Sequence, residues 1–192
     1  AYQMALLWKL TGTEQYAKNV INILNQWAAT CTEVTSNDAN HKLAAGAQGY
    51  TFANAAEIMQ TYDGWTEADK ATFKTWIVKV FASKNKDFLD NHQGSSNCAL
   101  HYWSNWDLVN MCSYLSIGIL TEDDDMVNYV INYFYNGAGN GALNNLIQGT
   151  HIDPLSNEEI CQNQESGRDQ GHAQMSAAVT ANLCQIAYTF YQ

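Results

Sequence analysis

Residues 162–174, QNQESGRDQGHAQ, place a dense group of polar side chains at the start of an apolar segment. Arg168 and His172 are four residues apart, so on a helix that begins near Gly167 they would project from the same face. A guanidinium group can bind a carboxylate through two parallel hydrogen bonds, and an imidazole can carry a proton near neutral pH. This pair therefore predicts acid–base chemistry on an acidic substrate.

A structural interpretation of the same run is an ion pair between Arg168 and a neighbouring acid, Glu165 or Asp169, that organises only the helix start. More glutamines surround these charges than an ion pair requires. They are Gln162, Gln164, Gln170 and Gln174. In the entering loop, Glu165 and its neighbouring glutamine would line the same site. Both interpretations stay open on the residues alone.

A second group of candidate residues lies in HYWSNWDLVN, residues 101–110. His101, Asn105 and Leu108 follow an i, i+4, i+7 spacing, which places them on one face of a predicted helix. Aromatic residues form a neighbouring face: Tyr102, Trp103 and Trp106. Rings beside an amide and an imidazole are typical of a sugar-binding cleft, because sugar rings stack on aromatic faces while hydroxyl groups need directed partners. The alternative is a buried aromatic helix with its polar groups hydrogen-bonded in the core.

The elements that must position these residues are predicted to be helices. Pro154 is the only proline, so long helices are permitted almost everywhere. Apolar residues recur at helical spacing along the chain, one helix is predicted from about Leu100 to Leu120, and the last is predicted from about Asp169 to Phe190. NGALNNLIQ is predicted to be a short helix and no strand pattern competes. The predicted fold class is all-α, built from antiparallel helical hairpins.

Two helix starts carry recognisable capping signals. Thr66 followed by Asp69 resembles a capping box with the shorter acid. The run TEDDDM, residues 121–126, places four acids in a first turn, where the helix dipole favours them. We predict a solvated helix start there and not a calcium site, because the alternating ligand spacing is missing. Similarly, GAGNGA at 137–142 is predicted to be a helix stop and turn, since it lacks the GxGxxG spacing.

Composition limits the classes of protein and partner. The chain has 192 residues, with 9 Lys plus Arg against 19 Asp plus Glu and a formal charge of -10. This charge argues against nucleic acid or an anionic membrane surface as the main partner. No apolar run approaches the roughly 20 residues that span a bilayer. We predict one helical domain over residues 1–192, as an internal piece of a longer helical protein, because both ends lack capping signals.

The remaining titratable residues are predicted to be structural or exposed. Cys112 and Cys184 lie in apolar helical stretches and are predicted to be buried thiols. Two of the other three cysteines, Cys31, Cys98 and Cys161, could form a disulfide. A disulfide would weakly favour a secreted protein. His41 and His92 lie in polar stretches and are predicted to be on the surface. Trp8, Trp27, Trp65 and Trp76 are predicted to pack in or beside the core.

Four segments together resemble a known family: LTGTEQYAKNVINILNQWA, GYTFANAAEIMQTY, HYWSNWDLVNM and QESGRDQGHAQM. In this order they are similar to the helical alginate lyase superfamily, polysaccharide lyases that act on uronate polymers such as alginate or glucuronan. The most specific motifs are SNWDL and ESGRDQGH. The resemblance implies an incomplete (α/α) toroid with a cleft across one end, a secreted or periplasmic enzyme, and an anionic polysaccharide as its partner.

The chemistry that the resemblance implies is β-elimination, in which a base removes the C5 proton of a uronate. Asn105 and Arg168 are the candidates to neutralise the substrate carboxylate and stabilise the developing enolate. His172 is the candidate base and His101 a second one. The acid would be Tyr102, a tyrosine outside this chain, or the base itself. Predicted substrate contacts are Tyr102, Trp103, Trp106, Gln164, Glu165 and Gln170. The scheme requires neither a metal nor a cofactor.

One departure from the family concerns the base. Related lyases place adjacent Asn and His residues in the middle helix, and here Ala99 and Leu100 stand at that place. Two other classes remain as alternatives. A glycoside hydrolase would use two carboxylates, Glu165 with Asp107 or Asp169. A noncatalytic, carbohydrate-binding helical scaffold would use the same residues only for packing or binding.

Overall fold

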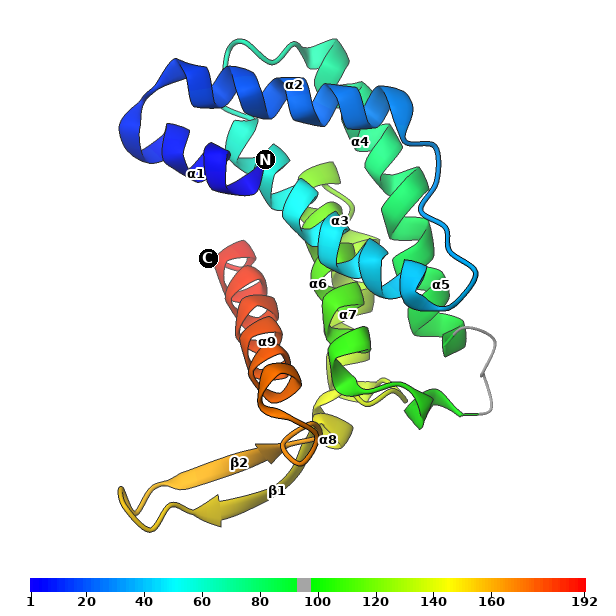
Figure 1. Ribbon diagram of the computed structural model, residues 1–192, viewed down its shortest axis with the longest axis vertical. Coiled ribbons are helices and arrows are strands. Elements are labelled where there is room, and N and C mark those ends of the chain that lie inside the picture. The colour runs from blue at the N-terminus through cyan, green and yellow to red at the C-terminus, as the bar shows by residue number, and fades with distance from the viewer. Residues whose placement is uncertain (93–97) are drawn as a thin grey trace.

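The computed structural model describes residues 1–92 and 98–192, and it is mostly helical (Figure 1). The helices are α1 (Tyr2–Thr11), α2 (Glu14–Thr30), α3 (Asn40–Met59), α4 (Glu67–Ile77), α5 (Ser83–Asn91), α6 (Ser104–Thr121), α7 (Asp124–Asn136), α8 (Leu143–Leu146) and α9 (Gln170–Phe190). A π-helical turn, η1 (Val78–Ala82), joins α4 directly to α5, and a 3-10 turn, η3 (Ala99–His101), precedes α6. The predicted all-α class is confirmed.

Helix α6 lies at the centre of the packing, in contact with α3, α5, α7 and α9. Helices α1, α2 and α4 lie at one end of the molecule and α9 runs beside α6 (Figure 1). The closest packing is between α3 and α6, where a Cβ added to Gly46 would lie 2.7 Å from Val109 Cγ2. Glycine therefore permits the backbones to approach each other, which fixes α6 as the frame for the candidate site.

The helix starts follow the predicted capping chemistry. The Thr66 hydroxyl accepts a hydrogen bond from the Asp69 N–H at 3.1 Å, and Asp123 caps α7 by accepting from the Met126 N–H at 3.0 Å. The acids of residues 122–125 thus start a helix, as predicted. The glycine run 137–142 ends α7 and turns towards α8, again as predicted.

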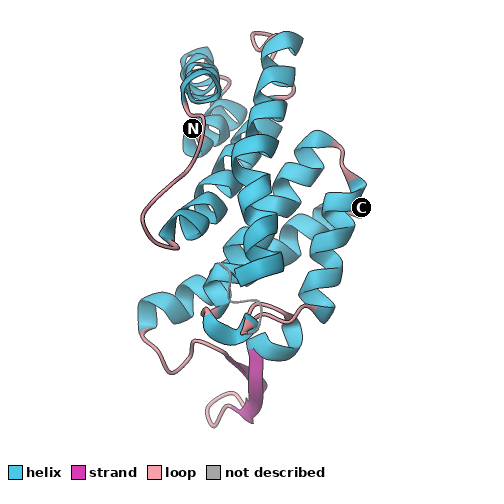
Figure 2. Cartoon of the chain, turned by 90° about the vertical axis from the view of Figure 1, so that its right-hand side faces the viewer, coloured by secondary structure: helices cyan, strands magenta, loops and turns pink. Residues whose placement is uncertain are grey.

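The prediction that no strand is present is wrong. After α8 the chain forms an antiparallel hairpin of β1 (Ile147–Ile152) and β2 (Glu159–Asn163), with a register shift between Ile147 and Gly149. The hairpin projects beyond the helices at the end opposite α1 and α2 (Figures 1 and 2). Because almost every hairpin residue is exposed, the strands need no alternation of apolar and polar residues, and this is the signal that the prediction sought.

The helix predicted to start near Leu100 instead begins at Ser104. Tyr102 and Trp103 are extended and separate the 3-10 turn from α6. His101 therefore does not share a helix face with Asn105 and Leu108, contrary to the prediction. The last helix is close to its predicted bounds, but it begins at Gln170, so Arg168 precedes it and is not on a helix face with His172.

The cysteines follow the prediction only in part. Cys112 is buried as predicted, whereas Cys184 is exposed on α9. All five cysteines are free thiols, so the suggested disulfide among Cys31, Cys98 and Cys161 is not formed. Trp65 and Trp76 are buried, whereas Trp27 is 46% exposed. Across the described residues, no helix has both the length and the apolar character needed to span a bilayer.

Candidate active site

Glu165 is the centre of the polar group at the start of α9. Its side chain has no exposed surface, and its carboxylate accepts hydrogen bonds from the Asn105 backbone N–H at 2.7 Å and from the Ser104 hydroxyl at 2.9 Å. The Asn105 side-chain amide donates to both carboxylate oxygens at 2.8 and 2.9 Å. These donors satisfy both oxygens of the buried carboxylate, which also caps the N-terminus of α6 from another part of the chain.

These contacts assign structural positions to three predicted site residues. Asn105 is 2% exposed and uses its amide on Glu165, so it does not face the surface. The Gln164 side-chain oxygen accepts from the Ser104 N–H at 3.0 Å, which caps the same helix end. The predicted substrate contacts of Gln164 and Glu165 are thus replaced by contacts within the protein. The α6 N-terminus and the segment before α9 form one unit.

Arg168 connects this buried unit to the surface. It is the only arginine in the chain. One Nη atom donates to Glu165 Oε2 at 3.2 Å, and the guanidinium lies 5.0 Å from the centre of the Trp103 ring. The side chain of Arg168 is 27% exposed. Trp103, taken as a whole residue, is 40% exposed. The predicted ion pair with Glu165 is therefore present, yet part of the guanidinium and of an aromatic ring remain open to a ligand.

His172 is held by Asp169, the N-cap residue of α9. Asp169 Oδ1 accepts from the His172 backbone N–H at 3.0 Å, and Oδ2 lies 2.6 Å from His172 Nδ1. The hydrogen bond from that backbone N–H, together with the imidazole, lowers the pKa of the Asp169 carboxyl below its usual value. An ionised Asp169 makes Nδ1 the protonated nitrogen, so the neutral imidazole carries its lone pair on Nε2. The nitrogen that can accept a proton is therefore Nε2, the one that does not contact Asp169.

The predicted aromatic face is divided between the surface and the interior. Tyr102 packs 4.7 Å from Trp106 and 5.2 Å from Phe88, measured between ring centres, whereas His101 is exposed beside it. Burial raises the pKa of the Tyr102 hydroxyl, so the phenol stays protonated at neutral pH. The Asn140 amide donates to the Tyr102 carbonyl at 2.7 Å and fixes this segment. Gln170 is exposed at the start of α9.

His92 was predicted to be on the surface, and this prediction is wrong. It is 3% exposed and not on the surface, because its Nε2 lies 3.0 Å from Asp107 Oδ1 and 3.1 Å from the Tyr133 hydroxyl. Asp107 also accepts from the Gly141 N–H at 2.8 Å. Burial and the nearby Asp107 raise the pKa of Tyr133 above its usual value. His92 has a left-handed backbone, with φ of 43°, but no local sequence signal joins it to partners 15 and 41 residues away.

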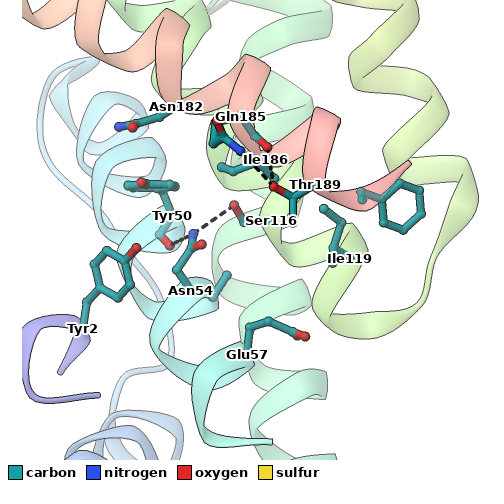
Figure 3. Close-up of a pocket in the computed structure, with 12 residues that line it drawn as sticks. Tyr2, Tyr50, Asn54, Glu57, Ser116, Ile119, Asn182, Gln185, Ile186 and Thr189 are labelled. Atoms are coloured by element: carbon teal, nitrogen blue, oxygen red, sulfur yellow. Dashed lines mark hydrogen bonds between the residues drawn. The ribbon is translucent and has the colours of Figure 1, made fainter. Parts of the chain in front are cut away.

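A cavity of about 560 Å³ lies between α1, α3, α6 and α9, and none of the predicted site residues lines it. Asn182 and Gln185 reach it from α9, while Tyr50 and Asn54 reach it from α3 (Figure 3). Glu57 is the single charged residue in the lining, and burial raises the pKa of its carboxyl. This cavity has no cation to bind a polyanion. Over residues 1–92 and 98–192, no three His, Cys, Asp or Glu side chains gather as a metal site.

The fold and the site define an all-α protein with an exposed Arg–Trp pair beside an Asp–His dyad. The alginate lyase family model matches residues 1–148, which is more than half of the chain, so the protein belongs to the alginate lyase family. The matched part contains HYWSNWDL and ends before Arg168 and His172. Comparison with curated proteins and with solved structures gives no match.

Proposed function

We propose that this protein is a polysaccharide lyase that cleaves a 4-linked uronate polymer, alginate or glucuronan, by β-elimination. The observation that carries the proposal is the exposed Arg168–Trp103 pair beside the His172–Asp169 dyad, in a member of the alginate lyase family. The reaction needs a group that neutralises the carboxylate and a base for the C5 proton, for which the guanidinium and the imidazole are suited, and an exposed aromatic ring can bind the sugar. In this proposal the helices form an incomplete (α/α) toroid within a longer catalytic domain.

The first step is neutralisation of the uronate carboxylate. The C5 proton is scarcely acidic while the adjacent carboxylate keeps its full charge. Hydrogen bonds from Arg168 would stabilise the enolate that develops when the C5 proton leaves. Because Glu165 holds one side of the guanidinium, its exposed part is presented in a fixed orientation. Trp103 supports the guanidinium and offers the rest of its ring to the sugar.

The second step is proton transfer and bond cleavage. The Nε2 atom of His172 takes the C5 proton, the C4=C5 double bond forms, and the C4–O4 bond breaks. The departing O4 receives a proton from the neutral Tyr102 phenol, or from the protonated His172 in a syn elimination. The exposed His101 is the second candidate base, and Gln170 a candidate contact for sugar hydroxyls. Neither step uses a metal or a cofactor.

Asn105 and Gln164 act as positioning residues in this proposal. They bind Glu165 and the α6 N-terminus, and so they set the place of Arg168 and Trp103 without touching the sugar. Asn105, which the sequence suggested as a partner of the carboxylate, thus acts through Glu165. Because the proposed substrate is a polymer found outside the cell, we place the protein in the secreted or periplasmic compartment; fractionation of a producing cell tests this.

A hydrolase is less well supported by the geometry. The carboxylates that the sequence offered for hydrolysis include Glu165 and Asp107, and both side chains have no exposed surface. Each is already surrounded by protein donors. A glycosidase needs both of its carboxylates in contact with the scissile bond.

The test is ultraviolet absorbance of the new double bond when the protein is mixed with alginate or with glucuronan. We expect the signal to grow with the wild type and to fall by at least about a hundredfold in rate with Arg168→Ala. Arg168→Lys should recover only part of the rate, because it keeps the charge but loses the planar fork. Lys79→Ala removes an exposed cation from η1 and serves as the control. Reducing ends without the absorbance would show hydrolysis, and no product with either polymer would refute the proposal.

A further inference from the structure

One face of the β1–β2 hairpin gathers polar side chains outside the proposed active site. Opposite residues of an antiparallel pair point to the same side, and sides alternate along each strand. His151 is opposite Ile160, and Gly149 is opposite Gln162, so these four share a face. The contact of His151 Nε2 with Gln162 Oε1 at 3.0 Å agrees with this arrangement.

The two faces of the hairpin differ in charge. The opposite face carries Thr150, Cys161, Ile152 and Glu159, so it includes a carboxylate. The face of His151 has no acid, one imidazole, one amide and the half-exposed side chain of Ile160. In a chain with a formal charge of -10, a polyanion is repelled by most of the surface. The His151 face is therefore the side of the hairpin on which an anionic polymer can lie.

This face continues into the proposed active site. Gln164 directly follows the end of β2 at Asn163, its backbone N–H donates to the Leu146 carbonyl at 2.7 Å, and its side-chain oxygen accepts from the Ser104 N–H at the start of α6. Trp103 and Arg168 lie at that same helix start. The register shift falls on β1, so the alternation of sides along β2 holds as far as Asn163, the residue before Gln164.

We propose that the hairpin face of Gly149, His151, Ile160 and Gln162 is a binding subsite for a further uronate residue of the polymer whose reacting residue binds at Arg168. This inference rests on the proposed function. The Gln162 side-chain oxygen Oε1 accepts from Nε2–H of His151, which leaves Nδ1 to bind a sugar hydroxyl or, when protonated, a carboxylate. Among the described residues, no hydrogen-bond partner of Nδ1 is present. Ile160 would pack against the C–H groups of the sugar ring.

The hairpin tip limits the length of the subsite. Hydrogen bonds from Ser156 and from the Leu155 N–H lower the pKa of the Asp153 carboxyl, so the tip is negatively charged. Glu158 adds a second acid there. The polymer is expected to leave the protein before it reaches the tip.

The experiment measures binding and cleavage of alginate and glucuronan oligomers of increasing length by His151→Ala and Gln162→Ala. For oligomers long enough to reach the hairpin we expect affinity to fall about threefold to tenfold, with KM raised and kcat unchanged, because neither residue contacts the reacting atoms. Disaccharides and other short oligomers should bind the variants as they bind the wild type. Thr150→Ala, an exposed change on the opposite face of the same strand, is the matched control.

The outcomes separate this inference from the proposed function. If the wild type binds and cleaves a polyuronate while His151→Ala and Gln162→Ala match it at every length, the subsite is wrong and the lyase proposal stands. An equal loss with Thr150→Ala would show that the hairpin as a whole is disturbed and would also overturn the subsite. If the wild type neither binds nor cleaves either polymer, the proposed function fails and the subsite fails with it. Circular dichroism of each variant checks that the fold is retained.

Discussion

Two carboxylates without exposed surface lie near the N-terminus of α6, and their surroundings differ. Glu165 binds groups at the helix start together with Arg168, whereas Asp107 binds His92, Tyr133 and the N–H of the glycine turn. Each carboxylate has several donors, so burial and hydrogen bonding alone do not distinguish a functional site from a structural one.

The difference lies in what connects each carboxylate to solvent. Glu165 is linked to Arg168, which is 27% exposed, and through it to the exposed Trp103. The partners of Asp107 are closed in, with His92 3% and Tyr133 8% exposed. A substrate can reach the first cluster and not the second. We therefore propose that the chemistry takes place at the Glu165 cluster, called the open cluster below. The Asp107 cluster, called the closed cluster, holds α5, α6, α7 and the glycine turn together.

The largest expected effect separates catalysis from stability in the open cluster. His172→Ala should lower kcat by about 10² to 10⁴, because it removes the proposed base, while the unfolding free energy changes by less than about 0.5 kcal/mol. Steady-state absorbance kinetics and chemical denaturation measure the two quantities. His41→Ala, at the start of α3, is the control. A rate within twofold of the wild type would remove His172 from the chemistry.

The next effect concerns the buried carboxylate of the open cluster. Glu165→Ala should lower the free energy of unfolding by about 3 kcal/mol, because it leaves buried donors of Ser104 and Asn105 without an acceptor. Glu165→Gln keeps the shape and one acceptor and should cost less. Urea denaturation gives both values. An unchanged midpoint for Glu165→Ala would show that the carboxylate does not join α6 to the segment before α9.

The closed cluster should respond in stability alone. Asp107→Ala is expected to lower the free energy of unfolding by about 2 kcal/mol, since His92, Tyr133 and Gly141 lose their common acceptor. At a temperature where the variant is folded, kcat should stay close to that of the wild type. A loss of kcat comparable to that of His172→Ala would end the distinction between the two clusters.

The smallest effect tests the surface of the open cluster. Trp103→Leu keeps an apolar side chain but removes the ring under the guanidinium and the proposed sugar contact. We expect KM to rise about threefold to tenfold with a smaller change in kcat, as is typical of the loss of one exposed cation–π and stacking contact. Trp27→Leu, another exposed tryptophan, should leave KM unaltered. A similar rise in KM for both variants would argue against a role for this ring.

The sequence predicted those parts of the fold that depend on neighbouring residues. The Thr66 cap could be predicted because the N–H that it binds is only three residues away. The last helix could be predicted because its apolar period and its N-cap residue, Asp169, are local features of the sequence. The hairpin was missed since both of its faces are exposed. The start of α6 was placed too early because the extended Tyr102 and Trp103 lie in an otherwise continuous helical pattern.

The site was predicted in composition more than in geometry. The density of charges around Arg168 indicated the candidate site, which stays a prediction, whereas the family prediction is confirmed. The partner of Glu165 lies 60 residues earlier in the chain, so no spacing rule could show that Asn105 faces inward. His92 was wrongly placed on the surface for the same reason, because the two groups that bury it are distant in sequence.

The long separation between Glu165 and Asn105 has a consequence for the order of folding. Helix α6 and its packing on α7, the next helix in the chain, can form before this loop of 60 residues closes, because local contacts form faster than distant ones. The guanidinium is oriented only after closure. On dilution from denaturant we therefore expect helical circular dichroism to return before the proposed lyase activity, so that the protein passes through a compact, inactive state; simultaneous recovery of both signals would contradict this order.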